Sequence, residues 1–211
     1  MRERKLARTS KIMPRIHFCS IKNDASRFCD SELEAARLLQ LEFDDDVIAY
    51  NTQPASWQYS AYGKQLRYTT DIIVEHKIKG IYFEEVKVAK QLEIEKLSKK
   101  FKILKALFYK HYQCSLDIIT EEDIYIGDNI INLTKLYRFK KENISDACIS
   151  LLNKLPSKIS YAELIEFMKI NNCAIYDPLA LIAKKIYQFD IHTLLNPSTT
   201  LELQHYETAH I

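Results

Sequence analysis

Glycine is scarce in this sequence, with three residues in 211, and proline occurs only five times. Neither glycine-rich phosphate-binding pattern, G-x-x-x-x-G-K-[ST] or G-x-G-x-x-G, is present. The sequence therefore excludes nucleotide binding through the usual loops, and it lacks the composition of long flexible linkers. Because 47% of the residues are hydrophobic, the chain can form one or two folded cores.

The five cysteines are odd in number and widely spaced, and no C-x-x-C or H-x-x-x-H pair accompanies them. This pattern argues against a disulfide framework or a zinc site. No apolar run is long enough to cross a membrane, and the N-terminus lacks the apolar core of a secretory signal. We therefore expect a cytosolic protein without a membrane partner.

The net charge is only +2, so the distribution of charge says more than the total. The first fifteen residues contain six Lys or Arg and one acid. They predict a basic arm that contacts DNA phosphates through Arg2, Arg4 and Lys5, although a solubilising terminus or a transit peptide would have a similar composition. Segment 90–110 has helical apolar spacing. Its outer face carries further lysines that either contact DNA or form an ordinary solvated surface: Lys90, Lys96, Lys99 and Lys100.

Two strand-like segments, 66–75 and 81–88, are rich in β-branched and aromatic residues and are separated by a short polar turn. They predict an antiparallel pair. Because side chains alternate along a strand, Glu85 and Lys87 share one face, to which the partner strand adds Asp71. Carboxylates bind Mg²⁺ or Mn²⁺, and a lysine orients water or stabilises developing charge. The pattern indicates a metal-dependent hydrolase, with an exposed cross-strand ion pair as the alternative.

Five short motifs follow one another between residues 31 and 87. They are S-E-L-E at 31–34, L-E-F-D-D-D-V at 41–47, Q-P at 53–54, Y-T-T-D at 68–71 and E-V-K at 85–87. This ordered set resembles TnsA, the endonuclease subunit of heteromeric cut-and-paste transposases, over roughly residues 30–125. Thr70 and Asp45 stand where the family pattern has proline. Neither position is a metal ligand in that pattern.

The resemblance implies that Glu34, Asp71, Glu85 and Lys87 form a catalytic site for Mg²⁺, with Mn²⁺ as a substitute. Asp71 and Glu85 would ligate the metal, Glu34 would complete the ligand shell from a helix, and the Val86 carbonyl would add an oxygen. Lys87 would act on the attacking water. The sequence does not predict the number of metal ions.

Two of the site residues also have structural interpretations. Ser31 and Glu34 form the pattern of a capping box, in which the glutamate bonds back to the helix start. Gln53 is predicted to support the site, but a buried amide bonded to the backbone would look the same in sequence.

The resemblance further implies that the protein acts in the bacterial cytoplasm on double-stranded DNA at transposon ends. It would cut the non-transferred (5′) strand beside a TnsB-like DDE transposase, under a TnsC-like AAA+ regulator. Two alternatives are a repair or restriction nuclease that acts alone, and a non-catalytic adaptor that docks DNA ends and recruits the regulator.

The predicted fold class is α/β. The expected elements are a helix at 31–41, strands near 55–62, 66–75 and 81–88, a helix at 92–110 and a strand at 113–119. This order matches a restriction-endonuclease-like core, a mixed sheet flanked by helices. The acidic residues 121–123 are interpreted as a helix start or an exposed turn.

We expect three domains: a basic N-terminal arm at 1–30, the endonuclease domain at 31–140 and a winged-helix-like domain at 141–211. In the last, Ser145, Ser160 and Asp177 each mark a helix start. A short β-wing is predicted at 189–192 and 199–203. In TnsA proteins such a domain largely contacts TnsC. Two lysines on the third helix, Lys184 and Lys185, would contact phosphates or form a solvated pair.

Overall fold

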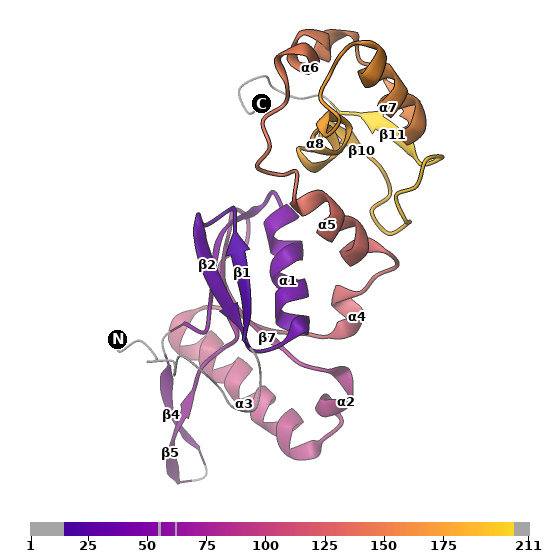
Figure 1. Cartoon of the computed structure of the whole chain (residues 1–211). Helices are drawn as coiled ribbons and strands as arrows, with labels where there is room; N and C mark the ends of the chain where they lie inside the picture. The colour runs from indigo at the N-terminus through magenta and orange to yellow at the C-terminus, as the bar shows by residue number, and fades with distance from the viewer. Residues whose placement is uncertain (1–14, 55, 62, 205–211) are drawn as a thin grey trace. The chain divides into compact units, whose positions relative to one another are not determined.

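The computed structural model describes residues 15–54, 56–61 and 63–204, and the chain divides into two compact units, Met1–Ile124 and Tyr125–Ile211 (Figure 1). The division precedes the boundary expected near residue 140. The reason is that helix α5 (Asn129–Tyr137) is bonded to the second unit. The Asn132 side chain donates to the carbonyls of Ile191 (2.8 Å) and Thr193 (2.7 Å).

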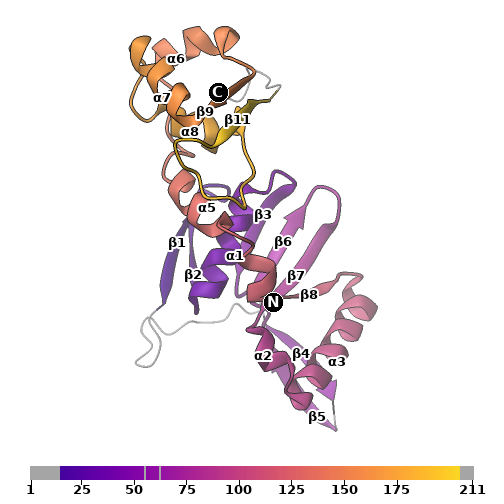
Figure 2. The same cartoon turned by 90° about the vertical axis from the view of Figure 1, so that its right-hand side faces the viewer.

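A mixed four-stranded sheet lies at the centre of the first unit, as predicted. Its strand order is β3 (Val47–Thr52), β6 (Ile72–His76), β7 (Gly80–Val86) and β8 (Leu116–Ile119), and Figure 2 shows them side by side. The first two pairings are antiparallel, whereas β7 and β8 are parallel. A parallel pair needs a long crossover, and residues 87–115 supply it with the helices α2 (Ala89–Leu92) and α3 (Glu95–Tyr112).

Helices α1 (Glu32–Phe43) and α3 cover opposite faces of this sheet. Phe83 packs with Phe101, Leu104 and Phe108 of α3. The next residue, Glu84, points to the other face and pairs with Arg37 of α1. The alternation predicted along β7 is therefore confirmed.

Two hairpins flank the sheet. The first, β1 (Ile16–Ser20) with β2 (Ala25–Cys29), replaces the arm that was expected to extend to residue 30. It is bonded to α1, where buried Glu42 accepts hydrogen bonds from Ser20 Oγ (2.5 Å) and the Lys22 amide (3.1 Å). Residues 1–14, with Arg2, Arg4 and Lys5, lie outside the described residues.

The second hairpin is β4 (Trp57–Ala61) with β5 (Lys64–Tyr68). The strand expected at 66–75 is thus broken into β5 and β6, with residues 69–71 between them. The acidic residues after β8 start a short helix, α4 (Glu121–Ile124), as expected. Asp123 accepts the Thr120 amide at 2.8 Å.

The second unit contains α6 (Asp146–Leu151), the 3₁₀ turn η1 (Leu152–Lys154), α7 (Tyr161–Ile170) and α8 (Asp177–Ala183) after α5. The predicted helix starts are confirmed. Ser145 caps α6, Ser160 forms a capping box at α7, and α8 begins at Asp177 with Pro178 in its first turn.

Three short antiparallel strands complete this unit, in the order β10 (Tyr187–Gln188), β11 (Thr200–Leu203) and β9 (Lys158–Ser160). The wing strand expected at 189–192 is wrong, because the chain turns there: the Thr193 amide donates to the Asp190 carbonyl at 3.0 Å. Among the helices that the structure describes, none has the length and apolarity needed to cross a bilayer.

Candidate active site

Three oxygen atoms converge on the ammonium group of Lys87. Its Nζ lies 3.0 Å from Asp71 Oδ2, 2.9 Å from Glu85 Oε1 and 2.9 Å from the Val86 carbonyl oxygen. The fold thus brings together the carboxylates and the lysine that the sequence placed on neighbouring strands.

Asp71 lies just before β6, where the β6–β7 ladder ends. The last paired residues are Ile72 and Glu84, and beyond them Asp71 Oδ2 accepts the Val86 amide at 2.9 Å. This side chain takes the place of the next backbone carbonyl in the ladder. The Asp71 carboxylate is therefore fixed by the sheet itself, and it is still 18% exposed.

Glu85 is buried, and its two carboxylate oxygens have different partners. Oε1 faces Lys87, and Oε2 accepts the Tyr68 hydroxyl at 2.5 Å. Burial raises the pKa of Glu85, and so does the charge of Asp71, while Lys87 and Tyr68 act in the opposite direction. Burial and the charge of Glu85 also raise the pKa of Tyr68, so this phenol remains a hydrogen-bond donor.

Lys87 keeps its charge in this setting. Burial lowers the pKa of Lys87, but the charges of Asp71 and Glu85 outweigh burial and the pKa is raised. With 25% of its side chain exposed, the lysine is the most accessible of the three charged groups.

Glu34 makes the bonds at the start of α1 that the sequence left open, and its carboxylate also feels the charge of Asp71. The Ser31 hydroxyl accepts the Glu34 amide at 3.2 Å, and the Glu34 carboxylate accepts the Asp30 amide at 3.0 Å. Burial and, next, the charge of Asp71 raise the pKa of Glu34 to about 6. Among the described residues, no set of three potential ligands within 4.8 Å of one another includes Glu34, Asp71 or Glu85. In this arrangement Glu34 interacts with Asp71 through charge, and that charge raises the pKa of Glu34.

Gln53 reaches the site mainly through its backbone. Its amide donates to the Asp71 carbonyl at 2.7 Å, and its φ is positive, at 45°. Its side-chain Nε2 donates to Asp30 Oδ2 at 2.6 Å, on the residue that also bonds Glu34. The sequence predicts that Gln53 supports the site, but it does not predict this backbone contact with Asp71.

Sequence reasoning missed two residues that hold the site in place. Tyr68 belongs to the Y-T-T-D motif, yet its bond to Glu85 depends on a break between β5 and β6 that the strand predicted at 66–75 ran through. Arg37 makes a two-point ion pair with Glu84, at 2.9 and 2.6 Å. This pair joins the helix of Glu34 to the strand of Glu85. No local spacing in the sequence indicates this pair, because its two residues are 47 positions apart.

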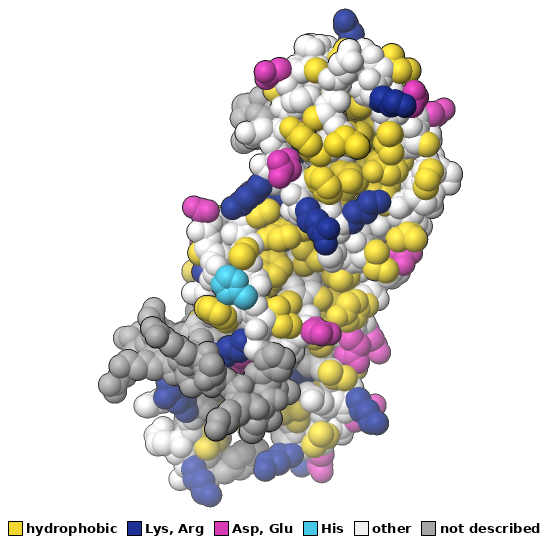
Figure 3. Space-filling view, in the orientation of Figure 1, with side chains coloured by type: hydrophobic (Ala, Val, Ile, Leu, Met, Phe, Trp, Pro, Cys, Tyr) yellow, Lys and Arg dark blue, Asp and Glu magenta, His cyan; other side chains and the backbone are white. Residues whose placement is uncertain are grey.

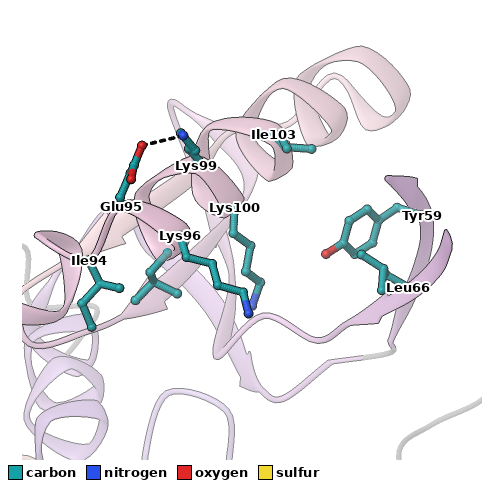
Figure 4. A pocket seen from close by; sticks show the side chains of 9 residues that line it. Tyr59, Leu66, Ile94, Glu95, Lys96, Lys99, Lys100 and Ile103 are labelled. Carbon is teal, nitrogen blue, oxygen red and sulfur yellow. Dashed lines mark ion pairs between the residues drawn. The ribbon is translucent and has the colours of Figure 1, made fainter. Parts of the chain in front are cut away.

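Three of the predicted DNA-contacting lysines line a cavity of about 660 Å³ beside this site (Figure 4). It lies between hairpin β4–β5 and the start of α3. Figure 4 shows Lys96 and Lys100 pointing into it, whereas Lys99 pairs with Glu95 at 2.5 Å. The complete lining is Tyr59, Leu66, Ile94, Glu95, Lys96, Leu97, Lys99, Lys100 and Ile103. Lys90 is exposed on α2.

The cavity is separate from the carboxylates but adjoins Tyr68, the residue that bonds Glu85. Lys100 Nζ lies 4.8 Å from the centre of the Tyr68 ring, and the hydroxyl of that ring bonds Glu85. None of Asp71, Glu85 and Lys87 lines the cavity.

Two other groups of potential metal ligands occur in the described residues. In the first, Cys148, Cys173 and Asp177, both Asp177 oxygens already accept hydrogen bonds from Ser145, and burial raises the pKa of the Cys148 thiol to about 12. In the second, Asp44, Asp46 and His76, the His76 Nδ1 accepts two backbone amides. Both groups are thus explained as local structure.

The donor set around Lys87 is made only of oxygen: two carboxylates and one carbonyl. Hard divalent cations such as Mg²⁺ and Mn²⁺ prefer such donors, and softer metals prefer sulfur or imidazole. The residues present therefore fit the metal that the sequence analysis anticipated.

Residues 44–121 match the family described as the TnsA-like endonuclease N-terminal domain. A search among curated proteins gave no match. The matched segment runs from the turn before β3 into α4. It contains Gln53, Asp71, Glu85, Val86 and Lys87, whereas Glu34 precedes it. The segment that carries Asp71, Glu85 and Lys87 is therefore similar to a TnsA-like endonuclease domain.

Proposed function

We propose that this protein is a metal-dependent DNA endonuclease that hydrolyses phosphodiesters with Asp71, Glu85 and Lys87. The observation that carries the proposal is the convergence of two carboxylates and the Val86 carbonyl on one point, within 3.0 Å of the Lys87 ammonium. A restriction-endonuclease-like core is the proposed fold of this unit, and its mixed sheet between α1 and α3 supports it.

The metal would be Mg²⁺, or Mn²⁺ in its place, held by Asp71, Glu85 and the Val86 carbonyl, with Glu34 adding negative charge nearby. When bound, such an ion polarises the phosphate and lowers the pKa of an attacking water. Tyr68 holds one Glu85 oxygen, which directs the other toward the site. Lys87 would place a positive charge beside the water and the phosphate.

DNA would lie along the lysines of α2 and α3. Lys96, Lys99 and Lys100 offer positive charge next to the hairpin that carries Tyr68, and Lys90 is exposed on α2. Phosphate neutralisation is the main source of affinity for DNA. The basic residues Arg2, Arg4 and Lys5 would extend this contact.

The specific reaction we propose is cleavage of the non-transferred 5′ strand at transposon ends, beside a TnsB-like transposase and under a TnsC-like AAA+ regulator. The family match and the order of motifs support this role.

The second unit would be a winged-helix domain that contacts the regulator. The order α6, β9, α7, α8, β10, β11, with β11 between the other strands, is the order expected of that fold. Figure 3 shows hydrophobic side chains gathered on the visible surface of this unit, as a protein contact requires. Its exposed large hydrophobics include Ile149, Ile165, Ile170, Ile175 and Leu194.

The test is Asp71→Ala, assayed on end-labelled transposon-end duplex together with the transposase and the regulator. We expect 5′-strand cleavage to fall by about a hundredfold or more, because losing a metal ligand removes several kcal/mol of transition-state stabilisation. Circular dichroism should show an intact fold. Glu75→Ala, at an exposed position on the strand that follows Asp71, is the matched control.

Cleavage by Asp71→Ala at the wild-type rate would defeat the proposal. Efficient cutting of plain duplex by the isolated chain would instead identify a nuclease that acts alone, and so remove the transposase partners from the proposal.

A further inference from the structure

The Lys87 ammonium lies where a metal ion would share the same three oxygens. Asp71 Oδ2, Glu85 Oε1 and the Val86 carbonyl all lie 2.9–3.0 Å from Nζ. A Mg²⁺ ion takes oxygen ligands at roughly 2.0–2.1 Å. An ammonium and a divalent ion cannot both occupy the space between the same oxygens, because two positive charges would then be in contact.

The lysine is the member of this group that is able to move. Asp71 is tied to the Val86 amide, and Glu85 is tied to Tyr68. Lys87 contacts the site only through the end of a flexible four-carbon chain, and a quarter of its side chain reaches solvent. An outward rotation of this chain would leave the three oxygens in place.

We propose that Lys87 is an exchangeable internal cation: its ammonium occupies the three-oxygen site until a divalent ion displaces it. This inference rests on the proposed function and adds a regulatory step to it. The ammonium that should act on water or phosphate is bound to the site's own carboxylates until metal arrives. Metal loading and release of the catalytic lysine are then a single event.

The direct test is chemical labelling of the wild-type protein with an acetylating reagent, followed by peptide mass spectrometry. Saturating Ca²⁺, which has the same preference for oxygen ligands, should increase acetylation of Lys87 by about threefold or more, as expected when a charge-assisted contact is lost. Acetylation of Lys158, an exposed lysine in the second unit, should not change. Unchanged or reduced labelling of Lys87 in saturating Ca²⁺ would overturn the inference.

A second test uses Lys87→Met, whose side chain has a similar length and no charge, with Lys158→Met as the matched control. Calorimetric titration should show that Lys87→Met binds Ca²⁺ about tenfold more tightly than wild type, since no ammonium competes for the oxygens. The thermal shift produced by Ca²⁺ should grow in parallel. Equal or weaker binding by a folded Lys87→Met protein would refute the exchange.

The two proposals fail differently. If wild type binds Ca²⁺ or Mn²⁺ but Lys87→Met binds it no better, the endonuclease assignment stands and the exchange is wrong. If neither protein binds a divalent ion, and Asp71→Asn leaves strand cleavage unchanged, both the endonuclease assignment and the exchange are wrong.

Discussion

Glu34 is a buried carboxylate near a second negative charge, and this position costs stability at neutral pH. Its pKa is about 4.5 in the unfolded chain and about 6 in the fold. Between these values the folded state binds more protons, so the free energy of unfolding falls as pH rises through this window. Above it, the buried charge costs on the order of 1–2 kcal/mol. Such a cost is expected where function needs the charge.

Glu34→Gln should therefore stabilise the protein while damaging the site. We expect a higher melting temperature at pH 8, no such gain at pH 4, and weaker Mn²⁺ binding. Thermal unfolding at both pH values measures the melting temperature, and calorimetry measures the Mn²⁺ affinity. Glu32→Gln, an exposed change in the same helical turn, is the control. Destabilisation at pH 8 would show that the bonds to Ser31 and Asp30 outweigh the burial of charge.

The Tyr68 hydroxyl favours the ionised form of Glu85, whose pKa burial has already raised. Tyr68→Phe should raise the pKa of Glu85 further, because a hydrogen bond to the charged form is lost. The acidic limb of the pH–rate profile should move to higher pH, with cleavage at neutral pH reduced about tenfold, as for the loss of a charge-assisted bond. A uniform loss of rate at every pH would point to packing alone.

For single residues, the sequence predicted which charged side chains come together. It did not predict the residues that hold them in place. Alternation along one strand was enough to place Glu85 and Lys87 together, and a short turn brought in Asp71. Tyr68 and the Gln53 amide act through contacts that depend on a break in the chain at residues 69–71. Strand propensity cannot show that break, because Thr69 and Thr70 within it and Tyr68 before it all favour extended backbone.

One buried ion pair joins α1 to β7. Glu84 is 1% exposed and has both oxygens bonded to Arg37. Arg37→Met should destabilise the fold by about 3 kcal/mol or more, because it leaves a buried carboxylate without a partner. Chemical denaturation measures this. Lys158→Met, which breaks an exposed pair with Glu202, should cost under about 1 kcal/mol.

Adding Glu84→Gln to Arg37→Met should recover part of the loss, because the unpaired charge disappears. Equal costs for Arg37→Met and Lys158→Met would show that α1 is held by apolar packing alone. Weakened metal binding by folded Arg37→Met would show that the pair also positions Glu34.

The elements that the sequence predicted well are those with clear starts. Serine caps and Asp177–Pro178 located three helices of the second unit to within a few residues. Strand β3 was missed because it follows α1 after a tight acidic turn and contains an irregularity between Val47 and Ala49, which disturbs the alternation of buried side chains.

At the scale of the whole chain, each unit has its own buried core. Leu38, Ile72 and Leu104 are buried in the first unit, and Leu164 and Leu181 in the second. Leu181→Ala should cost the second unit about 2–5 kcal/mol. It should leave Mn²⁺ affinity at Asp71 and Glu85 unchanged. Calorimetric scans with and without Mn²⁺ measure both effects, and a loss of metal affinity would show that the site depends on the second unit.

The parallel pairing of β7 with β8 also has a consequence for synthesis. The strand that carries Glu85 leaves the ribosome with an unpaired edge, because its partner begins only at Leu116. Until residues 116–119 emerge and α3 packs on Phe83, that edge is open to pairing with other chains. The candidate site is thus assembled late relative to its own residues, and a growing chain carries the carboxylates for some time before the sheet around them is complete.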